Sequence, residues 1–302
     1  MSSTGVSVTD EESLTDMVWA NAERFADAVS VRRHLDHSWL DVTARELAAH
    51  VLGVAKGLIA GGRAPGDRVG SPPEASYEWA VAEFAIWTAG YVSDPDGPPP
   101  DLDGLTARGA AVDEGTAHAR RLAVRAGDQA TAGLTHGELL GEVRSTIARY
   151  RHLFGAGNAM LVAAPPAQHA ARVLALCGIY TRTTLALGTA GDLGTFRPTV
   201  VVAGSELLEE VLDAARRRAY AEDRGGLFAA AEAVAVEYGR ALAGPGPNLA
   251  LRGKHLAASR FVYPKVRAAL GGRCTTVTCL GPGVSERLTH FFRGIGVTVH
   301  SV

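Results

Sequence analysis

The residues able to support nucleophilic, metal or phosphate chemistry are scattered along this sequence. No G-x-S-x-G, H-E-x-x-H or G-x-x-x-x-G-K-[ST] motif occurs in it. The ten histidines are dispersed, and His34 and His37, the closest pair, are expected on a solvated hairpin rather than at a metal. The turn Gly281-Pro282-Gly283 joins an expected strand to an expected helix. Its backbone amides either hold an anion or simply form a tight turn, and Pro282 has no N–H to donate.

The elements that must position these residues alternate between helical and strand patterns. Helices are expected to begin at the capping pairs Thr43–Glu46 and Thr135–Glu138, and after the N-cap Ser205. Strands separated by helices imply mainly parallel sheets flanked by helices, which is an α/β fold. The expected helices cover 14–28, 44–60, 75–89, 135–153, 168–180, 206–221, 226–243, 251–270 and SERLTHFF, and the expected strands are VSVRRH, SWLDV, DRVGS, AMLVAA, TTLAL, PTVVVA, TTVTC and VTVHSV.

The order of these elements predicts two subdomains. Residues 1–91 form an N-terminal α/β subdomain, 92–121 a linker or trimmed region, and 122–302 a second α/β subdomain. The segment VSDPDGPPPDLDG at 92–104 is too rich in proline, aspartate and glycine for regular structure. We interpret it either as a surface linker or as the place where a longer segment was removed.

Composition narrows the class of protein. Of the 302 residues 47% are hydrophobic and 21% charged, and the formal net charge of −2 argues against nucleic acid or an anionic membrane as partner. No apolar stretch is long enough to span a membrane, and the start MSSTGVSVTDEES is unlike a signal peptide, so we expect a cytoplasmic protein. The scarcity of lysine beside arginine indicates a GC-rich bacterial genome. Cys177, Cys274 and Cys279 are expected to be small buried residues rather than disulfide or zinc ligands.

Several stretches, in order along the chain, resemble bacterial long-chain fatty-acid–CoA ligases of the adenylate-forming superfamily. NAERFADAV, WLDVTARELAAHVLGVAKGLIAGGRAPGDRV and SYEWAVAEFAIWTAGYV resemble that family's opening subdomain. LTHGELLGEVRSTI resembles the helix after its phosphate-binding loop. RPTVVVAGSELLEEVLDAARRRA, FVYPKVRAALGGRC and ERLTHFFRGIGVTV resemble its central portion and the segment before its adenine-binding motif. The resemblance covers most of the chain and implies the α/β fold of the family's N-terminal domain, with deletions.

The resemblance also implies a phosphate-binding loop of the type YTSGTTGxPKG just before LTHGELL. In that loop, glycine amides, hydroxyl groups and a lysine hold the phosphates of ATP. This chain has the shorter sequence RAGDQATAGLTHGELL, in which the lysine is missing and Asp128 is acidic. The degenerate loop region retains Gly127, Thr131, Gly133 and Thr135.

Two further family motifs differ in this chain. The family's L-P-L-A-H segment aligns with 164–168, so its histidine is replaced by Gln168, with a histidine one position later. One step along a helix turns a side chain by about 100°, so this histidine is either an exposed helix residue or a displaced counterpart. The family's S-G-G-A-P-L segment aligns with 279–284. The resemblance therefore implies a residual groove for an acyl chain or acyl-CoA, lined by Ala164, Gln168, His169, Arg172 and Gly281.

These changes favour a non-catalytic relative of the acyl-CoA synthetases that acts by binding a protein, either an identical chain or an intact synthetase. The chain ends at Val302, before the family's adenine and magnesium motif and its C-terminal domain, which we expect to be absent. One alternative is a protein that binds an acyl chain or acyl-CoA. The other is an ATP-dependent long-chain fatty-acid–CoA ligase with residual activity. Only this last function would require ATP, Mg²⁺ and CoA, and we expect no catalytic residue and no cofactor otherwise.

Overall fold

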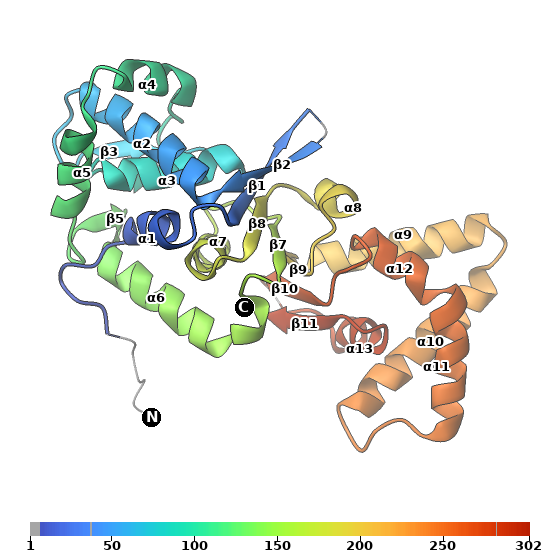
Figure 1. The fold of residues 1–302 in the computed structure, drawn as a ribbon. Coiled ribbons are helices and arrows are strands. Elements are labelled where there is room, and N and C mark those ends of the chain that lie inside the picture. Colours follow the sequence, from blue (N-terminus) through green and yellow to red (C-terminus); the bar gives the residue numbers. More distant parts are fainter. Residues whose placement is uncertain (1–6, 37, 282) are drawn as a thin grey trace. The chain divides into compact units, whose positions relative to one another are not determined.

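The chain has the predicted α/β fold, with mostly parallel strands flanked by helices (Figure 1). The computed structural model describes residues 7–36, 38–281 and 283–302. They form two compact units. The first unit holds the described residues up to Asn158 together with Pro165–Gly188, and the second holds Ala159–Ala164 and Thr189–Val302. The units do not follow the predicted boundaries at 91 and 121, because the chain passes between them more than once.

The first unit contains β1, which pairs antiparallel with β2 and parallel with β8, and a separate sheet in the order β3-β4-β5-β6. These strands are β1 (Val29–Leu35), β2 (Ser38–Thr43), β3 (Arg68–Gly70), β4 (Val92–Asp94), β5 (Gln129–Thr131), β6 (Leu134–Thr135) and β8 (Thr184–Leu187). The helices of this unit are α1 (Asp16–Arg24), α2 (Ala44–Ala60), α3 (Tyr77–Thr88), α4 (Leu102–Gly109), α5 (Glu114–Ala123), α6 (His136–Arg149) and α7 (His169–Thr181), with a 3-10 turn at Arg151–Leu153.

Helix α3 forms the centre of this unit. Every residue from Trp79 to Thr88 is buried, as expected for a helix that is apolar on nearly all sides. The indole Nε1 of Trp87 donates a hydrogen bond to the carbonyl of Ala130 on β5 at 2.8 Å. Among these buried residues Glu83 alone has an ionisable side chain, so its carboxyl group needs partners inside the core.

The prediction that 92–104 lacks regular structure is wrong at both ends, because β4 begins at Val92 and α4 at Leu102. Helix α5 also begins within the predicted linker or trimmed region, 92–121. Two aspartates of this region are helix caps. Asp101 accepts a hydrogen bond from the amide of Gly104, and Asp113 accepts one from the amide of Thr116, at the starts of α4 and α5. An aspartate favours either a turn or a helix start, and tertiary packing of the next residues decides between the two.

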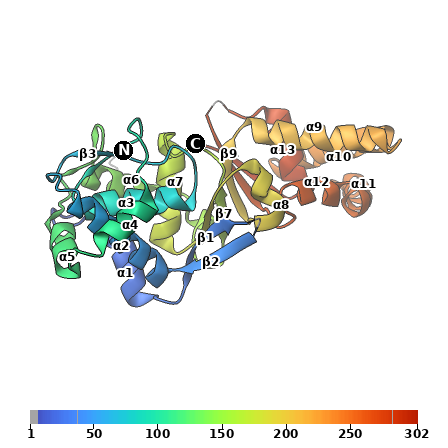
Figure 2. The same cartoon turned by 90° about the horizontal axis from the view of Figure 1, so that it is seen from above.

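The second unit is built on a parallel sheet with the strand order β11-β10-β9-β7. Helices α9 to α12 lie together beside it (Figures 1 and 2). Its strands are β7 (Ala159–Val162), β9 (Val200–Gly204), β10 (Thr276–Leu280) and β11 (Thr298–Ser301). Its helices are α8 (Leu193–Phe196), α9 (Glu206–Ala221), α10 (Gly225–Leu242), α11 (Leu249–Phe261), α12 (Tyr263–Ala269) and α13 (Glu286–Gly294), with a 3-10 turn at Ala190–Asp192.

Several local predictions can be compared with the observed elements. The capping pairs at Thr43 and Thr135 are confirmed, with both hydrogen bonds of each box present. The predicted cap at Ser205 is wrong, since this residue has helical backbone angles and its side chain makes no capping bond. The single helix predicted for 251–270 is interrupted at Val262, because Pro264 lies in the first turn of α12 and cannot donate an amide to a continuous helix.

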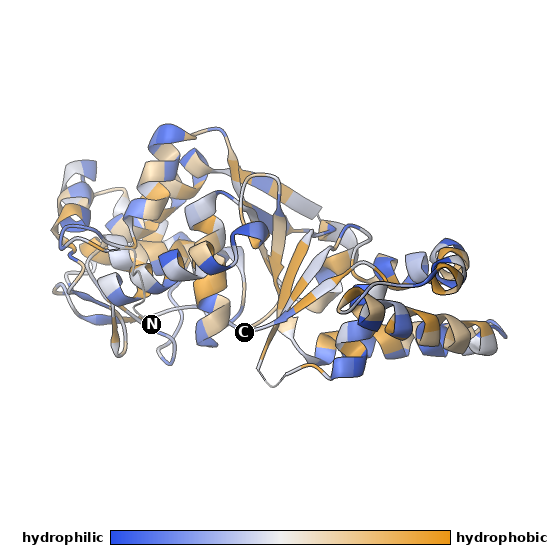
Figure 3. Ribbon diagram, turned by 90° about the horizontal axis from the view of Figure 1, so that it is seen from below, coloured by the Kyte–Doolittle hydropathy of each residue, from blue (hydrophilic) through white to orange (hydrophobic). Residues whose placement is uncertain are grey.

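The strands carry mainly hydrophobic residues, whereas the outer helices mix hydrophobic with hydrophilic ones (Figure 3). All three cysteines are buried and form no disulfide, which confirms the prediction of small buried residues. In the described part of the chain no helix has the length and apolar character needed to span a membrane. The same residues include no cluster of three histidine, cysteine or acidic side chains suited to a metal. His34 is exposed at the end of β1 and stacks on Trp39, while His37 lies outside the described residues.

Candidate functional site

The degenerate loop region forms a hairpin in the first unit rather than an open cradle. β5 and β6 pair antiparallel, and Gly133 takes the left-handed conformation (φ 83°) at the turn between them. Thr131 is buried in β5, where it pairs with Ser93 of β4. Thr135 is the N-cap of α6, and its hydroxyl accepts the amide of Glu138. The two threonines predicted for this site therefore stabilise the fold, Thr131 within a strand and Thr135 at the start of a helix.

Several backbone amides in and beside this hairpin donate hydrogen bonds within the chain. A phosphate cradle needs several free N–H groups that point to one place. Here the carboxylate of Asp128 accepts the amide of Arg125 at 2.7 Å, and Glu138 accepts the amide of Thr135 at 2.9 Å. Backbone carbonyls accept the amides of Ala126, Asp128, His136 and Gly137. Two carboxylates of the chain itself, those of Asp128 and Glu138, thus each accept an amide hydrogen bond that a phosphate would need.

A pocket of about 260 Å³ lies beside the hairpin, lined in part by Arg120, Asp128, Gln129 and His136. Burial lowers the pKa of His136 to about 4, an effect partly opposed by Asp128, so the imidazole is neutral at pH 7. The charges of Arg120 and Asp128 cancel, and the other lining residues are uncharged. This pocket offers a triphosphate no excess of positive charge.

The predicted groove residues on α7 have separate environments. Gln168 is the N-cap position, and its side chain makes no capping bond. His169, the first residue of α7, is 48% exposed and lies 2.7 Å from a carboxylate oxygen of Glu142. His169 is therefore an exposed helix residue, the first of the two interpretations given for it above. Arg172, one turn later, is 95% buried.

Arg172 belongs to a buried charged group that sequence reasoning missed. Its Nη1 lies 3.5 Å from Oε1 of Glu83, whose Oε2 accepts a hydrogen bond from Ser93 Oγ at 2.6 Å. Burial raises the pKa of Glu83, while Arg172 and the Ser93 hydroxyl act in the opposite direction. Oε1 of Glu83 and Nε of Arg172 lack hydrogen-bond partners among the described residues. The acidic residue Glu83 inside the otherwise apolar run from Trp79 to Thr88 was the signal that could have indicated this group.

The other predicted groove residues lie in the second unit, at the carboxyl edge of its parallel sheet. Ala164 follows β7, and Gly281 follows β10 with a φ of 89°. Between these strands β9 ends at Gly204, where an added Cβ would overlap the carboxylate of Glu206. Such an edge is where ligands bind in open α/β sheets. The predicted groove draws residues from both units, and it stays a prediction.

This edge carries negative rather than positive charge near the strand ends. Burial, with a smaller contribution from the carboxylate of Glu206, raises the pKa of Cys279 on β10 to about 11. Its thiol is therefore neutral and unreactive at pH 7. An acidic side chain at the end of the central strand disfavours a phosphate at this position. The edge has the architecture of a ligand site without the charge that a nucleotide requires.

The comparisons with known proteins agree with this architecture. Residues 18–99 match the family of AMP-binding enzymes. The chain is 30% identical over 363 aligned residues to the long-chain-fatty-acid–CoA ligase FadD15 of Mycobacterium tuberculosis and to that of Mycobacterium bovis, with 97% of this chain and 60% of each relative covered. The alignment is longer than this chain of 302 residues, so the relatives contain residues inside the aligned region that this chain lacks.

Solved structures extend the comparison of the fold. The long-chain-fatty-acid-CoA ligase FadD1 of Archaeoglobus fulgidus superposes with a TM-score of 0.67 at 12% identity, covering 98% of this chain and 64% of that one. A fatty acyl-adenylate ligase from L. pneumophila gives a TM-score of 0.57 at 14% identity, covering 93% and 52%. At these identities the likeness describes the fold.

The chain has the fold of the adenylate-forming enzymes. In sequence it is similar to the long-chain fatty-acid–CoA ligases, as the resemblance implied. It spans 60% of the length of the curated relatives that it matches.

Proposed function

We propose that this chain is a non-catalytic relative of the acyl-CoA synthetases, in the cytoplasm of a bacterium, and that it acts by binding another protein. The hairpin of β5 and β6 carries the first half of this proposal. Several amides in and beside it donate to Asp128, Glu138 and backbone carbonyls, and the adjoining pocket has no net positive charge. Adenylation depends on preorganised positive charge around the phosphates, and this region does not supply it.

We expect this chain to show no ATP–pyrophosphate exchange above background with long-chain fatty acids. The physical reason is the loss of the charge-assisted bonds to phosphate, each of which contributes about 1.5–3 kcal/mol. The assay measures radioactive pyrophosphate incorporated into ATP. An intact long-chain fatty-acid–CoA ligase, assayed in parallel, shows that the conditions support the reaction. Exchange clearly above background would contradict the proposal and restore the interpretation of a ligase with residual activity.

Exposed leucines on α11 support the second half of the proposal. Leu249 and Leu256 are 84% and 73% exposed. They are seven residues apart, so they lie on one face of the helix. Large apolar side chains grouped on one helix face are typical of interaction surfaces. Because such a face can bury itself against its own copy, a second chain is our first choice of partner and an intact acyl-CoA synthetase the second.

We expect the native mass of the purified chain to exceed that of a monomer, and the double variant Leu249→Glu/Leu256→Glu to shift it to the monomer. Two buried charges would each cost several kcal/mol at a dimer interface. Multi-angle light scattering after size exclusion measures the mass. The variant Leu122→Glu changes an exposed leucine on α5 and should leave the mass unchanged. A monomeric parent chain that also fails to bind an intact synthetase would refute this half of the proposal.

A further inference from the structure

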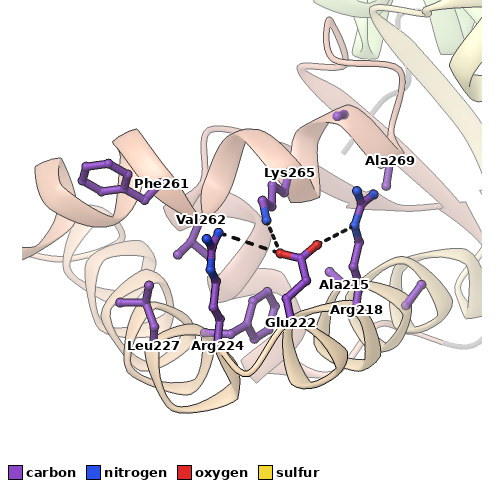
Figure 4. Close-up of a pocket in the computed structure, with 13 residues that line it drawn as sticks. Ala215, Arg218, Glu222, Arg224, Leu227, Phe261, Val262, Lys265 and Ala269 are labelled. Carbon is purple, nitrogen blue, oxygen red and sulfur yellow. Dashed lines mark hydrogen bonds and ion pairs between the residues drawn. The ribbon is translucent and has the colours of Figure 1, made fainter.

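A pocket of about 470 Å³ lies among helices α9, α10, α11 and α12 of the second unit (Figure 4). Its size falls within the range of small-molecule sites. Its walls come from small side chains on α9 and α12, where methyl groups leave space between the two helices. These residues are Ala214, Ala215, Ala219, Ala268 and Ala269.

The inner and outer parts of this pocket are both apolar. Phe228 and Val262 are buried and form its inner wall, whereas Leu227 and Phe261 are 56% and 65% exposed at its edge. When a ligand covers exposed large apolar side chains beside an apolar cavity, the removal of apolar surface from water favours binding. The cavity is thus suited to a hydrocarbon tail.

The polar groups of the pocket are concentrated around one carboxylate. Glu222 accepts hydrogen bonds from Lys265 Nζ at 2.7 Å and Arg218 Nε at 3.1 Å, and Arg224 Nη1 lies 3.8 Å from it (Figure 4). Three cations therefore face one anion, and the lining residues carry a net charge of +2, although the whole chain carries −2. The shared carboxylate of Glu222 connects Arg218 of α9 to Lys265 of α12. It balances only one of the three positive charges beside the apolar cavity.

We propose that this pocket binds an amphipathic anion, with the apolar tail among the alanines and the carboxylate or phosphate head beside Lys265, Arg218 and Arg224. The anionic head would share the three cations with Glu222 and balance the remaining charge. The site is separate from the strand-edge site and does not depend on the proposed function. The lining residues all belong to one compact unit.

Isothermal titration calorimetry with four probes tests the proposal, all below the concentrations at which they form micelles. Decanoate or decyl phosphate should bind, with decanol and butyrate at least about tenfold weaker because each lacks one half of the recognised structure. Decanoate affinity should fall as salt rises, since ions screen the head-group contribution. Binding of decanol as tight as that of both anions, or no binding of either anion, overturns the proposal.

Matched variants locate the binding site. Lys265→Met keeps most of the aliphatic stem and removes the charge, and it should weaken decanoate binding about fivefold. Lys254→Met on α11, outside the pocket lining, should not change the affinity. Ala268→Phe fills the cavity at an exposed position of α12 and should weaken binding about tenfold or more, while Ala257→Phe, exposed on α11, should not. Unchanged binding in both pocket variants would place the ligand elsewhere and refute the assignment.

Discussion

The variant Arg172→Met should have a free energy of unfolding about 3–5 kcal/mol lower than that of the parent chain. Arg172 is 95% buried and is the cation nearest to Glu83, which is fully buried on α3. Without the guanidinium, the carboxylate of Glu83 has only the Ser93 hydroxyl to stabilise its charge. It must either remain charged in an apolar environment or take up a proton. Urea unfolding followed by circular dichroism measures the loss.

The pH dependence distinguishes this mechanism from simple loss of packing. Burial already raises the pKa of Glu83, and removal of Arg172 raises it further. A carboxyl group with a raised pKa in the folded state loses stability as pH rises through that pKa, because the folded state must then release a proton at a cost. The destabilisation by Arg172→Met should therefore be larger at pH 8 than at pH 5. A loss that is the same at both pH values would contradict the role of Glu83.

Two control variants complete the test. The double variant Glu83→Gln/Arg172→Met removes both charges and should recover most of the lost stability, since a neutral amide can still accept the Ser93 hydroxyl. Arg45→Met breaks an ion pair with Asp27 whose side chains are 67% and 90% exposed. That change should alter the free energy of unfolding by less than about 1 kcal/mol. Recovery in the double variant would assign the loss to the unpaired charge.

The buried imidazole of His136 should make the chain less stable in mild acid. Burial lowers its pKa from 6.5 to about 4 in the folded state. Between these values the unfolded chain binds a proton that the folded chain does not bind. The stability contribution of the neutral ring is therefore complete above pH 6.5 and is lost as pH falls toward 4. At about 1.4 kcal/mol per pH unit, the loss over this interval is about 3 kcal/mol.

The variant His136→Gln tests this prediction through the slope rather than through the absolute stability. The ring accepts the amide of Leu14 at 3.4 Å and packs edge to face on Trp87, with 5.7 Å between the ring centres. The variant will therefore lose some packing at every pH. Between pH 6.5 and 4, however, its free energy of unfolding should fall by about 3 kcal/mol less than that of the parent chain. Equal slopes in the two proteins would contradict a neutral His136.

The arrangement around α6 explains how this helix start is stable without a bound anion. The capping box of Thr135 and Glu138 satisfies the first amides of α6 within the chain. Asp128 does the same for the amide of Arg125 before the hairpin. A helix N-terminus that has its own carboxylates remains stable without an anionic ligand, because its exposed donors are already paired.

Local features of this protein could be predicted from its sequence. The boxes at Thr43 and Thr135, the hairpin of β1 and β2, and the helix Glu206–Ala221 depend on residues a few positions apart. The predicted fold class was also correct, because alternating helical and strand periodicity requires a parallel sheet with helices packed against it. That the segment RAGDQATAGLTHGELL contains no lysine is also evident from the sequence alone.

The tertiary structure alone decided the features that depend on contacts between distant segments. It placed α4 and the start of α5 in the region predicted to be a linker or trimmed, and it assigned β7 to a different unit from the helix after it. It also brought Arg172 to Glu83 across 89 positions of sequence, and it assembled the cations at Glu222 from α9, the start of α10 and α12. A charge is stabilised by the groups near it in space, and sequence patterns report only the groups near it along the chain.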